Sequence, residues 1–203
     1  MVPASIKKVV QVSDEALDMA GEDFLRYLYD ELTYRIAKKA ADDLVASICQ
    51  APTPEETPAV TDEPVQGNIG VTSIGVGTIA QAIANLSDEA TNPVIVMNKL
   101  TWGAFKAAQY ANGFNADPFE GLRVVFNNSL PSFADADPND VFAIVGDFGQ
   151  GALANFPNGQ DIELKVDRLT LKKQDLVEIL GRMYVATAAV APYAFCRISK
   201  VTE

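Results

Sequence analysis

Histidine is absent from the 203-residue sequence, and its absence restricts the chemistry that the chain can perform. Histidine is the most frequent general base and metal ligand in proteins, and it completes most nucleophile triads. No serine of the chain lies in a nucleophile-elbow motif either. We therefore predict that the chain is not an enzyme and that it has no catalytic residue, no cofactor and no metal site.

Cysteine is scarce, because the chain has only Cys49 and Cys196. They are far apart in the sequence and match no metal-ligand spacing, so we predict two small buried hydrophobic side chains. Basic residues are also few: 16 Lys and Arg stand against 27 Asp and Glu, which gives a net charge of −11. A surface of this charge repels nucleic-acid phosphates and anionic membranes.

Long hydrophobic runs are missing as well. The longest candidate, residues 183–194, is interrupted by Pro192 and falls short of the roughly 18 apolar residues that a membrane-spanning helix needs. We therefore predict no membrane contact.

The first recognisable pattern is a strand followed directly by a long helix. Residues 6–12 alternate in polarity and predict the strand, and Ser13 can cap the helix that follows. Gly21 predicts a kink or a short break in this helix. Apolar residues then recur at mostly four-residue steps and predict one buried helix face: Leu17, Phe24, Leu28, Leu32, Ile36, Ala40, Leu44 and Ile48.

Residues 51–66 hold four prolines and predict an exposed acidic linker or loop. The pattern beyond it is mixed α/β and then all β. Helices are expected at residues 78–86 and 102–110, with Thr101 as the cap of the second helix and Gly113 at its end, and Trp102 and Phe105 are expected in the core. Strands are expected at residues 92–98, 121–127, 141–147, 151–156, 162–166, 176–188 and 195–201, with a solvated loop at 128–140.

A glycine-rich stretch offers an alternative from another class of protein. Gly75, Gly77 and Ala80 fit the G-x-G-x-x-A pattern of a dinucleotide-binding enzyme. In that fold the next strand ends in an acidic residue that holds the ribose, whereas here Asn98 and Lys99 follow it. A single glycine fingerprint is weak, so a loop that enters a helix is the preferred interpretation.

Several segments together resemble the major capsid proteins of tailed bacteriophages, whose Hong Kong ninety-seven type shell fold is shared with encapsulins. The strand-to-helix segment resembles the strand that returns from the family's extended loop into its spine helix, and the later segments resemble strands and a helix of its axial and peripheral lobes. The segments that carry the likeness are residues 9–17, 92–108, 119–131, 141–153 and 177–199.

This resemblance implies an α+β shell fold with a long spine helix, a β-rich peripheral lobe and an axial α/β lobe. It assigns residues 1–50 to the peripheral lobe, 51–66 to a linker or loop, 67–158 to the axial lobe and 159–203 to strands that complete the peripheral lobe. The family's N-terminal arm and most of its extended loop have no counterpart here, so we expect monomers or small oligomers from this chain.

The function implied by the resemblance is structural: a self-assembling subunit of a phage or prophage icosahedral capsid that encloses double-stranded DNA. The implied partners are copies of the chain in hexamers and pentamers, a scaffolding protein, a protease and DNA held without sequence-specific contact. The implied location is the virion, after synthesis in the bacterial cytoplasm. An encapsulin-type compartment shell is the alternative within the same fold.

Overall fold

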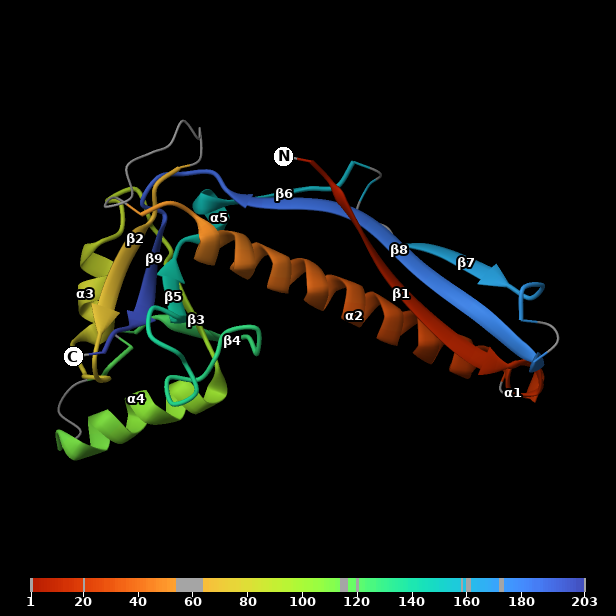
Figure 1. Ribbon diagram of the computed structural model, residues 1–203, viewed down its shortest axis with the longest axis horizontal. Coiled ribbons are helices and arrows are strands. Elements are labelled where there is room, and N and C mark those ends of the chain that lie inside the picture. The colour runs from red at the N-terminus through yellow and green to blue at the C-terminus, as the bar shows by residue number, and fades with distance from the viewer. Residues whose placement is uncertain are drawn as a thin grey trace. The chain divides into compact units, whose positions relative to one another are not determined.

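The computed structural model describes residues 2–19, 21–53, 64–113, 117–119, 121–157, 159, 162–171 and 174–202, and its elements are drawn in Figure 1. The chain forms two compact units. The first unit comprises Met1–Asp43 and Ala154–Thr187, and the second comprises Leu44–Leu153 and Ala188–Glu203.

The first unit opens with the predicted strand and helix. Strand β1 (Ala4–Ser13) leads into helix α1 (Asp14–Met19), and helix α2 (Gly21–Gln50) follows. The hydroxyl of Ser13 accepts a hydrogen bond of 3.2 Å from the backbone N–H of Ala16, so the predicted N-cap is confirmed. The break predicted at Gly21 lies where the two helices are divided.

The sheet of the first unit is built around the long strand β8, which pairs antiparallel with β1 and with β7. Ile6 lies opposite Met183 and Val10 lies opposite Ile179, so alternate residues of both strands share one face. Residues of α2 pack on that face: Leu32 lies beside Ile179, and Ile36 lies beside Ile6 and Met183. Besides β1, the strands of this sheet are β6 (Ala152–Asn155), β7 (Glu163–Asp167) and β8 (Leu176–Ala189).

The second unit holds a five-stranded sheet in the order β2-β9-β5-β3-β4. The β2–β9 and β3–β4 pairs are parallel, whereas β5 runs antiparallel to both of its neighbours. The central strands carry continuous apolar runs, as expected where both faces of a sheet are covered. The strands are β2 (Gly67–Val71), β3 (Val94–Met97), β4 (Arg123–Phe126), β5 (Val141–Gly146) and β9 (Phe195–Lys200).

The second unit contains the end of α2 together with α3 (Thr78–Ala84), α4 (Lys99–Ala111) and α5 (Phe148–Gly151). The core between α3, α4 and the sheet contains Ile79, Phe105 and Phe142, which are fully buried. The end of α2 contributes to a second cluster, where Ile48 packs with Phe195. Phe105 is therefore a core residue, as predicted.

Two sequence-based assignments are wrong. Asn98, not Thr101, caps α4: its side chain accepts from the N–H of Leu100, whereas Thr101 is buried and its hydroxyl accepts from the N–H of Phe133. The closing strand β9 was assigned to the peripheral lobe with residues 159–203, but it pairs with β2 and β5 inside the second unit. The position of β9 depends on its pairing with strands that are distant in sequence. The local sequence pattern does not predict this pairing.

Two buried polar side chains fasten the second unit. The guanidinium of Arg197 donates to the carbonyl oxygens of Cys49 and Ala51, both at 2.7 Å, at the C-terminal end of α2. Those carbonyls have no partner inside the helix, and a cation suits the negative end of the helix dipole. The amide of Gln66 donates to the carbonyl of Ala191 at 2.8 Å and accepts from the N–H of Phe195 at 3.0 Å.

Both cysteines are free thiols; Cys196 is buried, as predicted, whereas Cys49 is only half-buried. Burial raises the pKa of the Cys49 thiol to about 11 and that of Cys196 to about 12. Both thiols therefore stay protonated at neutral pH and act as small hydrophobic groups. Across the part of the chain that the structure describes, no helix combines the length and apolar character needed to cross a membrane.

Candidate functional site

The glycine-rich stretch does not form a dinucleotide site. Gly77 caps the short helix α3 without a side-chain hydrogen bond, and the N–H of Gly75 donates to the hydroxyl of Thr78. In a dinucleotide-binding unit the strands before and after the helix are close neighbours in the sheet. Here β9 and β5 separate β2 from β3. Gly75, Gly77 and Ala80 therefore belong to an ordinary loop and helix start.

Two pockets lie in the second unit. One of about 380 Å³ lies between the end of α2 and the loops before β5, and Cys49 and Asp140 line it. The other, of about 240 Å³, is lined by Glu89, Asp147 and Tyr193. Within the described residues, no group of three or more acidic or cysteine side chains is placed to hold a metal ion.

Asp147 is a buried acidic residue that caps helix α5. Its carboxylate accepts from the N–H groups of Gly149 at 2.9 Å and Gln150 at 3.3 Å, and so caps α5. It also accepts from the N–H of Asn92 at 3.0 Å. These donors, with that of Asn92 first, lower the pKa of Asp147 below its ordinary value. These hydrogen bonds hold the carboxylate of Asp147 against the backbone, where it caps α5.

Replacing Asp147 with alanine is expected to lower the free energy of unfolding by about 2 kcal/mol at neutral pH, because three N–H groups lose their acceptor. Its folded pKa lies below the unfolded one, so the stabilisation is complete above about pH 4 and is lost as the pH falls through the folded value. Urea unfolding at pH 7 and pH 3 measures this. The deficit of Asp147→Ala should shrink at pH 3, and an equal deficit at both values would contradict the assignment.

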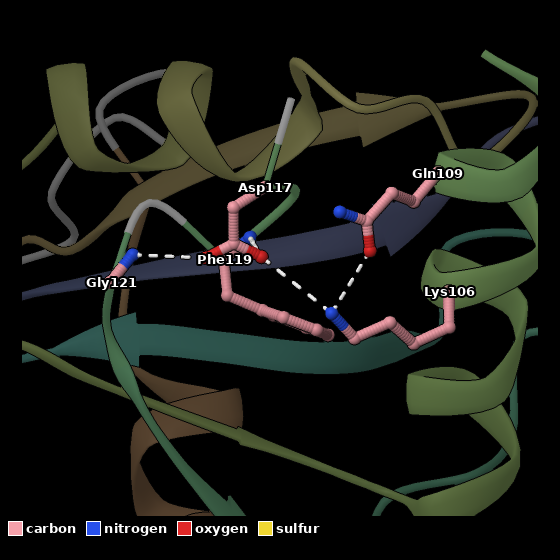
Figure 2. Close-up of polar contacts among 5 residues, drawn as sticks. All are labelled: Lys106, Gln109, Asp117, Phe119 and Gly121. Carbon is pink, nitrogen blue, oxygen red and sulfur yellow. Dashed lines mark hydrogen bonds and ion pairs between the residues drawn. The ribbon is translucent and has the colours of Figure 1, made fainter. Parts of the chain in front are cut away.

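A cluster of polar contacts joins α4 to the segment that leads into β4 (Figure 2). The ammonium of Lys106 donates to the side chain of Gln109 at 3.0 Å, lies 3.6 Å from the carboxylate of Asp117 and sits 4.9 Å from the centre of the Phe119 ring. The same carboxylate accepts from the N–H of Gly121 at 3.3 Å. These contacts fix the start of β4 against α4, and Lys106 is already neutralised within the unit.

Exposed apolar side chains lie on α4 and β4 of the second unit. Leu100 is 68% exposed, and Trp102 lies with its ring edge-on to Phe126 at 6.4 Å between centroids, both rings being open to solvent. Trp102 was predicted in the core, and that prediction is wrong. Thr101 and Phe105 define the buried face of the helix, and Trp102 lies about 100° around the axis from Thr101.

The first unit exposes large side chains on both of its layers. Tyr27 and Tyr34 are 62% and 60% exposed and lie seven residues apart on α2, so they share one face of the helix. Val166 on β7 is 57% exposed, and Leu169, in the bend after β7, is 80% exposed. Where exposed apolar groups gather into a patch, the patch is characteristic of a surface that contacts another protein.

Comparisons with known proteins identify the fold that carries these surfaces. A family model described as "Phage capsid family" matches residues 1–200. A sequence comparison with curated proteins finds no match.

Solved structures agree with the family model. The capsid of an empty GTA particle matches with a TM-score of 0.77 at 16% identity, over 98% of this chain and 74% of that chain. The holo-SrpI encapsulin complex of Synechococcus elongatus PCC 7942 matches with a TM-score of 0.70 at 12% identity, over 98% of this chain and 74% of that chain. A structure of Mycobacterium phage Bobi matches with a TM-score of 0.63 at 14% identity, over 100% of this chain and 73% of that chain.

These sequence identities are too low to transfer any residue's role. The TM-scores show that the chains share a common shell fold. The expected mixed helix and strand architecture with a long helix is confirmed by that likeness. The match over residues 1–200 identifies the family, and the exposed apolar side chains are consistent with a protein that contacts other protein surfaces. The chain belongs to the phage capsid family, and it is a structural capsid subunit.

Proposed function

We propose that this chain builds an icosahedral shell from hexamers and pentamers of itself, and that the shell encloses double-stranded DNA of a phage or prophage. The family match over residues 1–200 carries the proposal. The distribution of apolar side chains supports it, because each unit has a closed core and also leaves aromatic residues such as Tyr27 and Trp102 open to solvent.

The net charge of −11 suits a container for DNA. A lining that does not grip phosphate lets an enclosed genome move, because acidic groups repel it. Further proposed partners are a scaffolding protein and a maturation protease, with synthesis in the bacterial cytoplasm and a final place in the virion. A mainly positive inner surface in an assembled shell would contradict the role of charge.

Self-association of the purified chain tests the proposal. Size-exclusion chromatography with light scattering should give an average mass that rises with protein concentration, as reversible contacts between copies require. Added salt should change this mass, because charged groups flank the exposed apolar residues. A mass that equals one chain at every concentration up to the millimolar range would contradict self-assembly by this chain.

An encapsulin-type compartment is the second candidate, favoured by the likeness to the SrpI encapsulin complex. The two functions differ in their contents. Shells that contain DNA after nuclease treatment would support the capsid, and shells that retain a co-expressed cargo protein would support the compartment.

A further inference from the structure

The pocket of about 380 Å³ at the end of α2 lies wholly within the second unit. Its apolar lining comes from three places in the chain: Val45 and Ala46 of α2, Leu130 after β4, and Val141 of β5. The volume falls near the lower end of the range for small-molecule pockets, about 300 to 1,000 Å³. The space therefore suits a compact organic molecule.

The walls of this pocket are held in place. Val45 is 5% exposed and Leu130 is 2% exposed, and both belong to the core cluster at the end of α2. The backbone that enters β5 is tied to the last residue of β9. The N–H of Asn139 donates to the carbonyl of Lys200 at 2.7 Å, and the N–H of Lys200 donates to the carbonyl of Asp140 at 3.0 Å. The pocket is therefore preorganised for a ligand.

A bulge at the start of β5 brings Val141 to the pocket. The pairing of β5 with β9 is irregular between Val141 and Ala143. Phe142 and Ala143 both pack in the core beside α3 and α4, whereas Val141 and Ile144 pack in the cluster at the end of α2. In a regular strand Val141 would share a face with Ala143. Bulges that re-aim a side chain in this way are frequent beside functional sites.

The charge of the lining is negative. Among the described residues that line the pocket, Asp140 alone is charged, and its carboxylate accepts from the N–H of Asp137 at 3.0 Å. An ionised carboxylate can accept about four such bonds, and no ion pair within the described ranges includes Asp140. Arg197, whose charge acts on the Cys49 thiol, donates to the carbonyl oxygens of Cys49 and Ala51 and does not line the pocket. A ligand that pairs with Asp140 must therefore bring its own positive charge.

We propose that this pocket binds a small organic amine. The apolar body of the amine packs against Val45, Leu130 and Val141, and its ammonium group donates to the carboxylate of Asp140. The net charge of −11 attracts such cations to the chain. Binding of the amine does not require self-assembly, so the two proposals can fail separately.

Three probes of similar shape separate the effect of charge from that of shape. At neutral pH phenethylamine is a cation, phenethyl alcohol is neutral and phenylacetate is an anion. Ligand-observed nuclear magnetic resonance with the full chain gives a dissociation constant for each probe. Phenethylamine should bind about fivefold more tightly than the alcohol, as expected for one solvent-exposed ion pair, and phenylacetate should bind most weakly. Asp140→Asn keeps an acceptor for the N–H of Asp137 and should remove the advantage of the amine.

A matched pair of substitutions locates the binding site. Ala41 and Ala46 are both exposed on α2, and of the two only Ala46 lines the pocket. Ala46→Trp fills the pocket with an indole and should weaken the binding of phenethylamine at least about tenfold, because the phenyl ring loses its buried contacts. Ala41→Trp should bind the probe as the wild type does. Circular dichroism confirms that each variant is folded.

Three results would overturn the inference. Absence of saturable binding by phenethylamine would remove the pocket as a ligand site. Equal affinity of Ala46→Trp and the wild type would place the ligand elsewhere. Equal affinity for phenethylamine and phenylacetate, or a preference for the amine that survives Asp140→Asn, would remove the pairing of ammonium with carboxylate. Each of these results leaves the proposed self-assembly intact.

Discussion

Replacing Arg197 with methionine is expected to lower the free energy of unfolding by about 3 to 5 kcal/mol. The side chain is only 5% exposed, and its charged donors reach the carbonyl oxygens of Cys49 and Ala51. Methionine fills a similar volume but leaves both carbonyls without this donor. Urea unfolding followed by circular dichroism measures the loss.

Arg182→Met is the matched control. Arg182 forms its ion pair with Glu163 at 2.6 Å, but the Glu163 side chain is 47% exposed and the pair is open to solvent. An exposed pair contributes no more than about 1 kcal/mol. If both methionine variants lost the same small amount, the importance assigned to Arg197 at the end of α2 would be refuted.

Replacing Gly146 with alanine is expected to cost more than about 3 kcal/mol, at the upper end of the range for overpacking. An added Cβ would lie 2.5 Å from the carbonyl oxygen of Ala194 and 2.9 Å from the Cα of Phe195. Both are backbone atoms of the paired segment, so a change of rotamer cannot relieve the clash. The thermal midpoint and the yield of soluble protein measure the effect.

Gly103→Ala gives the same chemical change with the opposite expected sign. Gly103 lies inside α4, and an added Cβ there meets no atom within 4 Å. Alanine should stabilise the protein by about 0.5 to 1 kcal/mol, because glycine loses more backbone freedom in a helix. Equal effects at Gly146 and Gly103 would mean that the contact between β5 and β9 is not as tight as described.

Local pattern was enough to predict the elements of the first unit. The alternation before Ser13 and the four-residue spacing of apolar residues in α2 report burial directly, and Leu32, Ile36 and Ile48 are all almost completely buried. The Ser13 cap was readable for the same reason, since a cap acts within one helical turn.

Local pattern could not predict which strands would pair. Strand β9 lies beside β2, and Gln66 bonds to Phe195 across 129 residues of sequence. The residues next to Gln66 and Arg197 in the sequence do not indicate that these side chains are buried. They also do not indicate the parallel register of β2 and β9. The family resemblance supplied the shell fold but placed β9 in the wrong lobe.

The exposure of Trp102 was the other property that the sequence pattern did not predict. Trp102 follows a buried threonine in an apolar helix, so composition favours a core position. Only the pairing of β4 with β3 and the seating of Phe105 turn the indole outward, where it contacts Phe126. The exposed position of Trp102 was thus not predictable from residue types alone.

Electron microscopy of the largest chromatographic fraction tests whether this chain is a subunit that assembles with copies of itself. We expect discrete particles, rings or curved groups, whose class averages show rotational symmetry and contain both units of the fold. Single chains at every loading concentration, or aggregates without any repeating contact, would contradict it.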